Sequence, residues 1–152
     1  MAKQSAGILL YRQAATTEVM LVHPGGPFFT RKDPGSWSVP KGEYLEDEDP
    51  LHAAKREFFE ETGHVAEGEL IALLPVKQKG GKVVRAWALE GDMDTGSLVS
   101  NTFELMWPPR SGKMQTFPEV DKAAWFPIAV AREKINAGQL SLLDQLEVLL
   151  RK

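Results

Sequence analysis

The chain has 152 residues, of which 43% are hydrophobic and 26% are charged, a composition typical of one folded domain with an ordinary hydrophobic core. It contains no cysteine, which excludes disulfide bonds, thiolate zinc sites and a cysteine nucleophile. The formal net charge of −3 gives no reason to expect electrostatic capture of duplex DNA or of an anionic membrane. Residues 8–11 form too short an apolar run for a signal peptide and no later run is long enough to cross a membrane, so we expect a cytoplasmic protein.

Short apolar runs separated by a long loop make up the beginning of the chain. Residues 6–11 and 18–23 predict two strands, and residues 37–39 predict a third, shorter one. Between them, residues 23–36 read HPGGPFFTRKDPGS, and these prolines and glycines predict a loop. Because long loops in compact domains are often functional, this loop is a candidate part of a binding site.

Residues 50–62 predict a helix with recognisable ends. Asp49 is suited to the N-cap position, Pro50 to the first helical position, and Gly63 to the position just past the end. The remaining chain predicts strands at residues 70–78 and 82–89, joined by a turn at residues 79–81. We therefore expect an α/β protein, a single mixed sandwich spanning residues 1–152.

The last third alternates irregular and regular segments. Residues 91–101 and 107–119 look irregular, with a short strand at 103–106 between them and another at 123–126. A helix follows at residues 127–135. In the final helix, apolar residues recur every three or four positions, at Leu140, Leu143, Leu146 and Leu150. This stripe favours packing against the core, with the interface of a homodimer as the alternative.

The helix at residues 50–62 carries two different faces. The face suited to burial is formed by Leu51, Ala54 and Phe58. The adjacent face carries Glu57, Glu60 and Glu61, whose like charges repel within one turn and lie where the helix dipole disfavours anions. A divalent cation would offset this, because Mg²⁺ and Mn²⁺ accept converging carboxylate oxygens. A solvated acidic face, partly compensated by Lys55 and Arg56, is the alternative, and the helix alone leaves both open.

The spacing of the whole stretch from Gly42 to His64 favours the metal-site interpretation. Glu48 follows Gly42 after five residues, and REFFEETG follows at residues 56–63 after seven more. This pattern closely resembles the Nudix box, the signature of the Nudix hydrolases. The sequence departs from the box at its last position, where His64 replaces an aliphatic residue that normally packs rather than reacts.

The resemblance implies a fold and a metal site. The expected fold is the Nudix-type α/β/α sandwich, in which a mixed β-sheet lies between helices and a strand, a loop and a helix carry the box. The implied ligands for Mg²⁺ or Mn²⁺ are Glu57, Glu60, Glu61 and the carbonyl of Gly42, with one glutamate acting as general base toward a metal-bound water.

The resemblance also implies supporting residues. Arg56 is similar to the family arginine that orients the carboxylates, and Glu48 would support the same network. Residues 117–126, FPEVDKAAWF, resemble the segment in which many members supply a further glutamate, which makes Glu119 a candidate catalytic residue.

Substrate-binding candidates lie around the box. Lys41, Arg31 and Arg110 could neutralise phosphate, although each is also an ordinary surface cation. Trp37 is a candidate for stacking on a base, with Phe28, Phe29 and Trp107 as further aromatics in the same regions, and core packing is the alternative for it.

The resemblance implies a metal-dependent hydrolase that cleaves a phosphoanhydride bond in a nucleoside diphosphate linked to another moiety, by water attack at phosphorus. Residues 39–43, VPKGE, are similar to the start of the box in members acting on dinucleoside polyphosphates, so such a compound or a nucleoside triphosphate is the expected small-molecule partner. Two alternatives stay open: a catalytically silent Nudix-like sensor module and an RNA 5′-pyrophosphohydrolase.

Overall fold

The computed structural model describes residues 3–151, so the ends of the expected domain, residues 1–2 and 152, lie outside the described residues. A seven-stranded sheet forms the centre of the molecule, with the path β4-β6-β1-β2-β9, while β3 pairs with β1 and β5 pairs with β6. The sheet strands are β1 (Gln4–Gln13), β2 (Thr17–Pro24), β3 (Lys41–Glu43), β4 (Leu70–Ala72), β5 (Val76–Lys77), β6 (Val83–Glu90) and β9 (Val120–Pro127). The pair β1 and β6 is parallel and the other pairs are antiparallel, so the sheet is mixed as predicted.

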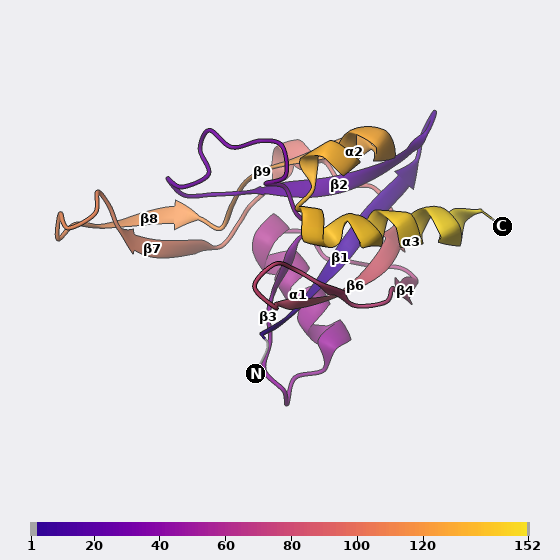
Figure 1. Cartoon of the computed structure of the whole chain (residues 1–152), viewed down its shortest axis with the longest axis horizontal. Coiled ribbons are helices and arrows are strands. Elements are labelled where there is room, and N and C mark those ends of the chain that lie inside the picture. Colours follow the sequence, from indigo (N-terminus) through magenta and orange to yellow (C-terminus); the bar gives the residue numbers. More distant parts are fainter. Residues whose placement is uncertain (1–2, 152) are drawn as a thin grey trace.

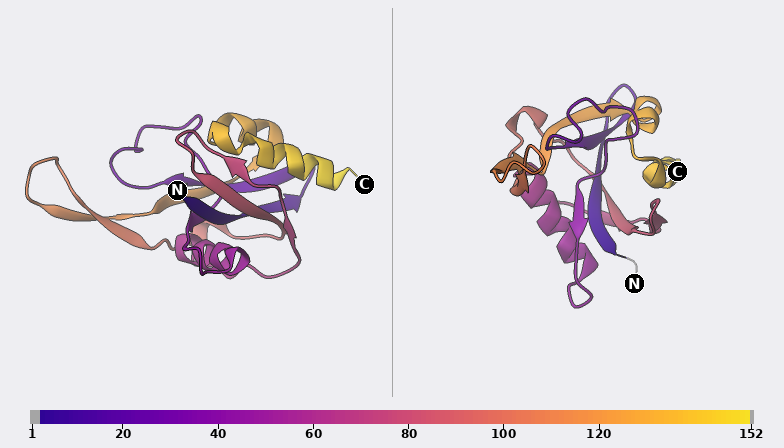
Figure 2. Two further views of the ribbon diagram at one scale, coloured as in Figure 1. Left: turned by 60° about the horizontal axis from the view of Figure 1, so that its bottom comes forward. Right: turned by 60° about the vertical axis from the view of Figure 1, so that its left-hand side comes forward.

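Helices cover both faces of this sheet (Figures 1 and 2). The helix α1 (Pro50–Thr62) lies on one face, and α2 (Ile128–Lys134) and α3 (Leu140–Leu150) lie on the other. Short 3₁₀ turns, η1 (Thr95–Ser97) and η2 (Ala137–Gln139), complete the connections. The predicted α/β/α sandwich is confirmed.

The central strand β1 is buried on both faces because it lies between the two helical layers. Ile8 and Leu10 pack with Phe58 of α1 in one apolar cluster. Leu9 packs in the other cluster with Leu143 of α3. Side chains alternate between the two faces of a strand, so consecutive apolar residues here serve two cores.

The C-terminal leucine stripe belongs to the second of these cores. Leu143 and Leu146 are fully buried, and Leu140 and Leu150 are partly buried against the same cluster. The core-packing interpretation of the stripe is confirmed. The homodimer stays an untested prediction.

The box helix begins and ends where the sequence predicts. The carboxylate of Asp49 accepts the backbone N–H of His52 at 3.0 Å, which caps the first turn. Gly63 adopts a left-handed conformation with φ of 78° and donates its N–H to the carbonyl of Phe59. A side chain at Gly63 would be strained in this conformation, so the glycine ends the helix.

Three predicted segments were wrong. Residues 37–39 do not form a strand, because Trp37 and Ser38 make only isolated bridges to Ile135 and Val22. The strand expected at residues 70–78 is split into β4 and β5 around Pro75, which has no N–H to donate to a ladder. The expected hairpin turn at residues 79–81 is present between β5 and β6.

The third error concerns the segment 107–119, which was expected to be irregular. It contains β8 (Met114–Pro118), which pairs with β7 (Thr102–Met106) in a separate two-stranded sheet. This hairpin extends away from the body of the protein (Figure 1). Its strands are short and largely exposed, so they lack the buried apolar alternation by which the central strands are recognised. Within residues 3–151, no helix is both long enough and apolar enough to span a membrane.

Candidate active site

A cleft with a volume of about 580 Å³ brings together segments that are far apart in the sequence. Its lining includes the acids of α1 with Gly42 of β3 and Glu119. We call Glu57, Glu60, Glu61, Gly42 and Glu119 the acidic half. The lining also includes neutral hydrogen-bonding side chains, and we call Ser38, Gln78, Asn136 and Gln139 the amide wall.

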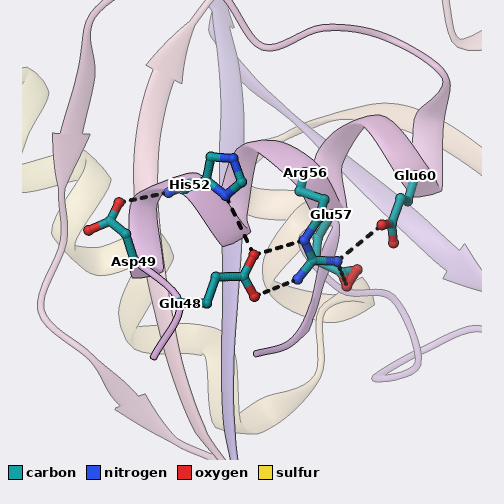
Figure 3. A network of polar contacts seen from close by, with 6 residues as sticks. All are labelled: Glu48, Asp49, His52, Arg56, Glu57 and Glu60. Atoms are coloured by element: carbon teal, nitrogen blue, oxygen red, sulfur yellow. Dashed lines mark hydrogen bonds and ion pairs between the residues drawn. The ribbon is translucent and has the colours of Figure 1, made fainter. Parts of the chain in front are cut away.

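Arg56 organises the acidic half from the adjacent helix turn (Figure 3). Its guanidinium donates two hydrogen bonds of 2.9 Å to the two carboxylate oxygens of Glu48. A third nitrogen donates to Glu57 at 3.1 Å and to Glu60 at 3.0 Å. The paired contact lowers the pKa of Glu48 below its ordinary value. One side chain therefore fixes the orientation of two acids, which is the supporting role predicted for Arg56 and Glu48.

Gly42 allows the backbone of β3 to lie directly against Glu57. A Cβ atom at position 42 would fall 2.0 Å from the carboxylate carbon of Glu57 and 2.0 Å from its Oε2. A side chain at this position fits only if the Glu57 carboxylate moves from its place in the cleft. The strand pairs Gly42 with Ala6 of β1, so the backbone cannot withdraw without breaking the ladder. The box glycine is thus required by a close approach to a site carboxylate.

Glu61 lies beside Lys41 in the acidic half. Burial raises its pKa to about 8, against the opposing effect of the nearby Lys41 ammonium. The backbone N–H of Lys41 donates to Oε1 of Glu61 at 3.2 Å. Burial also raises the pKa of Glu57, and the charge of Glu60 adds to this rise. These carboxylates are held where their negative charge is poorly solvated, so a cation in the cleft would stabilise them.

Glu119, the residue just before β9, lines the cleft. Its backbone N–H donates to the carbonyl of Asn101 at 2.9 Å, and the N–H of Asn101 donates to the carbonyl of Glu60 at 2.7 Å. The charge of Glu119 contributes to the raised pKa values of Glu57 and Glu61. The structure therefore brings this candidate together with the box acids.

The acidic half offers oxygen atoms suited to a hard divalent cation. Arg56 bonds Oε1 of both Glu57 and Glu60, while Oε2 of each, and of Glu61, has no hydrogen-bond partner among the described residues. As the side chains lie, no group of three acidic or histidine residues within 3–151 is close enough together to hold a metal ion. The residues present fit such an ion in chemistry, because hard carboxylate oxygens meet in one cleft that is also lined by Gly42.

The predicted substrate-binding residues are distributed unevenly. Lys41 lines the cleft, and burial, with Lys82 nearby, lowers its pKa. Arg31 and Arg110 are exposed and do not line the cleft. Trp37 is only 4% exposed and donates its indole N–H to Asp33 at 2.7 Å, so the structure places it in the core.

Two further positions complete the comparison with the sequence. Phe29, which was also named as an aromatic candidate, lines the cleft, whereas Trp37 does not. His64 lies within hydrogen-bond distance of the Ser97 hydroxyl, 2.9 Å from it, and does not line the cleft. The departure from the box at position 64 therefore leaves the acidic half unchanged.

Sequence reasoning missed the amide wall and Lys82. Lys82 follows the glycine turn between β5 and β6, lines the cleft, and pairs with Glu43 at 3.4 Å. Gln139 reaches the same cleft from η2, and Gln78 reaches it from the end of β5. No spacing pattern in the sequence connects these residues, because only the tertiary fold brings them together.

Comparisons with known proteins agree with this geometry. A family model described as the NUDIX domain matches residues 1–146. An 8-oxo-(d)GTP phosphatase of Mycolicibacterium smegmatis (strain ATCC 700084 / mc(2)155) is 32% identical over 146 residues, which cover 88% of this chain and 37% of that protein. The chain thus spans little more than a third of the length of that relative.

Two solved structures share the fold over nearly the whole chain. An Ap4A hydrolase of C. elegans, crystallised as a binary complex, is 25% identical, with a TM-score of 0.64 and coverage of 98% of each chain. The NUDIX domain of Shewanella oneidensis NrtR, complexed with ADP ribose, is 18% identical, with a TM-score of 0.67 and coverage of 99% of this chain and 89% of that chain. At 18% identity, the likeness to the NrtR domain shows that the fold is shared and nothing more.

Proposed function

This chain belongs to the Nudix family, and we propose that it hydrolyses a phosphoanhydride bond in a nucleotide whose diphosphate is linked to another group. The observation that carries the proposal is the meeting in one cleft of Glu57, Glu60 and Glu61 with Gly42 and Glu119. The family membership predicted from the box is confirmed by the family model.

The proposed reaction needs charge neutralisation and an oriented water. Nudix hydrolases generally use divalent metal ions, usually Mg²⁺, and such an ion polarises phosphoryl oxygens and lowers the pKa of bound water. The residues that would hold Mg²⁺ or Mn²⁺ here are Glu57, Glu60, Glu61 and the Gly42 carbonyl. One carboxylate of the acidic half, that of a box glutamate or of Glu119, would accept the proton of the attacking water.

The other cleft residues complete the proposal. Arg56 keeps the carboxylates of Glu57 and Glu60 in place by its hydrogen bonds. Lys41 provides positive charge for the phosphate chain at the cleft wall. Arg31 and Arg110 are exposed outside the cleft, so they would contact only those parts of a long substrate that extend beyond it.

The relatives suggest two substrate classes. One is an 8-oxo-(d)GTP phosphatase, which points to a nucleoside triphosphate, and the other is an Ap4A hydrolase, which points to a dinucleoside polyphosphate. Both classes contain the phosphoanhydride linkage that the acidic half would attack. Cytoplasmic location and a homodimer stay predictions alongside this one.

The proposal is tested by nucleotide and phosphate release across one panel of substrates. The panel contains Ap4A, Gp4G, ATP, GTP, 8-oxo-dGTP, ADP-ribose and 5′-triphosphorylated RNA, each with Mg²⁺, Mn²⁺ or EDTA. Wild-type protein is compared with Glu60→Gln and with Glu46→Gln, which removes the same charge from an exposed loop position.

We expect metal-dependent release from at least one compound, lost in EDTA. Glu60→Gln should reduce turnover by about 100-fold or more, the scale seen when a group that stabilises transition-state charge is removed. Glu46→Gln should retain it. Turnover only of the RNA would favour the pyrophosphohydrolase alternative, and nucleotide binding without any turnover would favour the silent module.

A further inference from the structure

The amide wall contains a buried side chain whose orientation is fixed by the backbone. Gln139 is fully buried, and its Oε1 accepts the backbone N–H of Val39 at 3.1 Å. A backbone N–H can only donate, so the oxygen of the Gln139 amide must face Val39 and its NH₂ group must face the opposite way.

The NH₂ group of Gln139 in turn fixes a second amide. It donates to Oε1 of Gln78 at 2.8 Å and to the hydroxyl of Ser38 at 3.0 Å. Ser38 accepts this bond because its own proton goes to the carbonyl of Val39 at 2.7 Å. Since Gln139 presents donors to Gln78, the oxygen of Gln78 is turned toward Gln139 and its own NH₂ group points the other way.

The NH₂ group of Gln78 is available to a ligand. It has no hydrogen-bond partner among residues 3–151, and Ser5 Oγ is the one buried side-chain N or O atom in that range without a partner, so the Gln78 nitrogen contacts solvent. Gln78 lines the cleft next to Lys82, whose carbonyl accepts the Gln78 backbone N–H. Gln78, a residue of the cleft lining, thus carries a free donor group whose orientation is set, through Gln139, by the backbone N–H of Val39.

The surroundings of this donor suit a neutral ligand group. Ser38, Asn136 and Gln139 are uncharged, and the ammonium of Lys82 is already paired with Glu43. Phosphate oxygens would be better placed near free positive charge, whereas a neutral amide N–H matches the carbonyl oxygen at the edge of a nucleobase. Phe29 lines the same cleft and provides an aromatic face for a base.

We propose that Gln78, held in one orientation by Gln139, selects nucleotides whose base presents a carbonyl oxygen, such as guanine or hypoxanthine, over those that present an amino group, such as adenine. This inference rests on the proposed function, since it places the base of the same nucleotide in the amide wall. A 6-amino group would meet the Gln78 donor with another donor, leaving both unpaired.

The test measures binding separately from turnover. Dissociation constants of ITP and ATP are determined by calorimetry without added metal, because these two nucleotides differ in carrying an oxo or an amino group at C6. We expect ITP to bind about tenfold or more tightly, the effect of a satisfied hydrogen bond against a mismatched one. Equal affinities in the wild-type protein would overturn the inference and leave the hydrolysis panel as an independent test of the proposed function.

Two variants separate orientation from simple contact. Gln78→Met keeps the length of the side chain without the donor, and the ITP-to-ATP preference should fall to about one. Gln139→Glu keeps an oxygen for Val39 and presents a second oxygen to Gln78, so the Gln78 amide should turn and the preference should invert. The control is Gln13→Met, because Gln13 is exposed at the end of β1 and does not line the cleft. A preference that survives Gln78→Met unchanged would contradict the inference, even if Gln139→Glu fails to fold.

Discussion

Two groups of cleft residues are positioned in different ways. Most of the acidic half is local, because Glu57, Glu60 and Glu61 lie within about one turn of one helix and Gly42 precedes them on a short strand, while Glu119 comes from the residue before β9. The amide wall is assembled from residues 38, 78, 136 and 139, which lie on separate segments and meet only in the folded protein. The acids of α1 are therefore placed mainly by local structure, whereas the residues of the amide wall are placed by tertiary contacts.

We expect the largest effect from a substitution of Gly42, which tests whether the acidic half requires the close approach of this residue to Glu57. In Gly42→Ala the new Cβ would overlap the Glu57 carboxylate, which must move. Displacement of a site group by about 1 Å can reduce turnover by about 100-fold, and overpacking costs about 1–3 kcal/mol of stability. Thermal unfolding and turnover are measured together. Gly42→Ala with Glu57→Ala should recover the stability but not the turnover, and a Gly42→Ala protein with wild-type turnover would show that the close contact is unimportant.

A smaller effect tests the arginine that holds the acids. Arg56→Gln removes the hydrogen bonds to Glu48, Glu57 and Glu60, and loss of such supporting contacts typically reduces metal affinity or activity by about 10–100-fold. Lys55→Gln is the matched control, because it removes one positive charge from the exposed neighbouring position. Equal metal affinities of the two variants would show that Arg56 acts only through its charge.

The smallest effect concerns pH and Glu61. Its pKa is raised to about 8 in the metal-free protein, so below that pH a metal ion must displace a proton from it. Metal affinity should therefore rise with pH by up to about tenfold per unit and level off above about pH 8. Glu61→Gln should flatten this rise. A wild-type affinity that is constant between pH 6 and 8 would remove Glu61 from the ligand set.

Local sequence signals predicted the acidic half and its helix well. Asp49, Pro50 and Gly63 mark the ends of α1, and the bounds agree with the structure because capping depends on neighbouring residues. The segment 37–39 was predicted less well, since its apolar residues are buried by packing against Ile135 and other distant elements without strand pairing.

Sequence patterns do not contain the tertiary contacts that decide which other residues line the cleft. Trp37 was a reasonable stacking candidate by residue type, yet its hydrogen bond to Asp33 and its burial place it in the core, while Phe29 in the same loop lines the cleft. Gln78 and Gln139 are sixty-one positions apart and ordinary in their local context. Their orientation depends on one backbone N–H, a detail that periodicity and motif spacing do not carry.

The central claim is that the box acids hold a divalent metal ion, and Mn²⁺ binding measured by electron paramagnetic resonance tests it most directly. Wild-type protein and Glu46→Gln should reduce the signal of free Mn²⁺, whereas a variant combining Glu57→Gln and Glu60→Gln should leave most of the signal while remaining folded. Equal Mn²⁺ binding by the double variant, or no binding by the folded wild-type protein, would contradict the account.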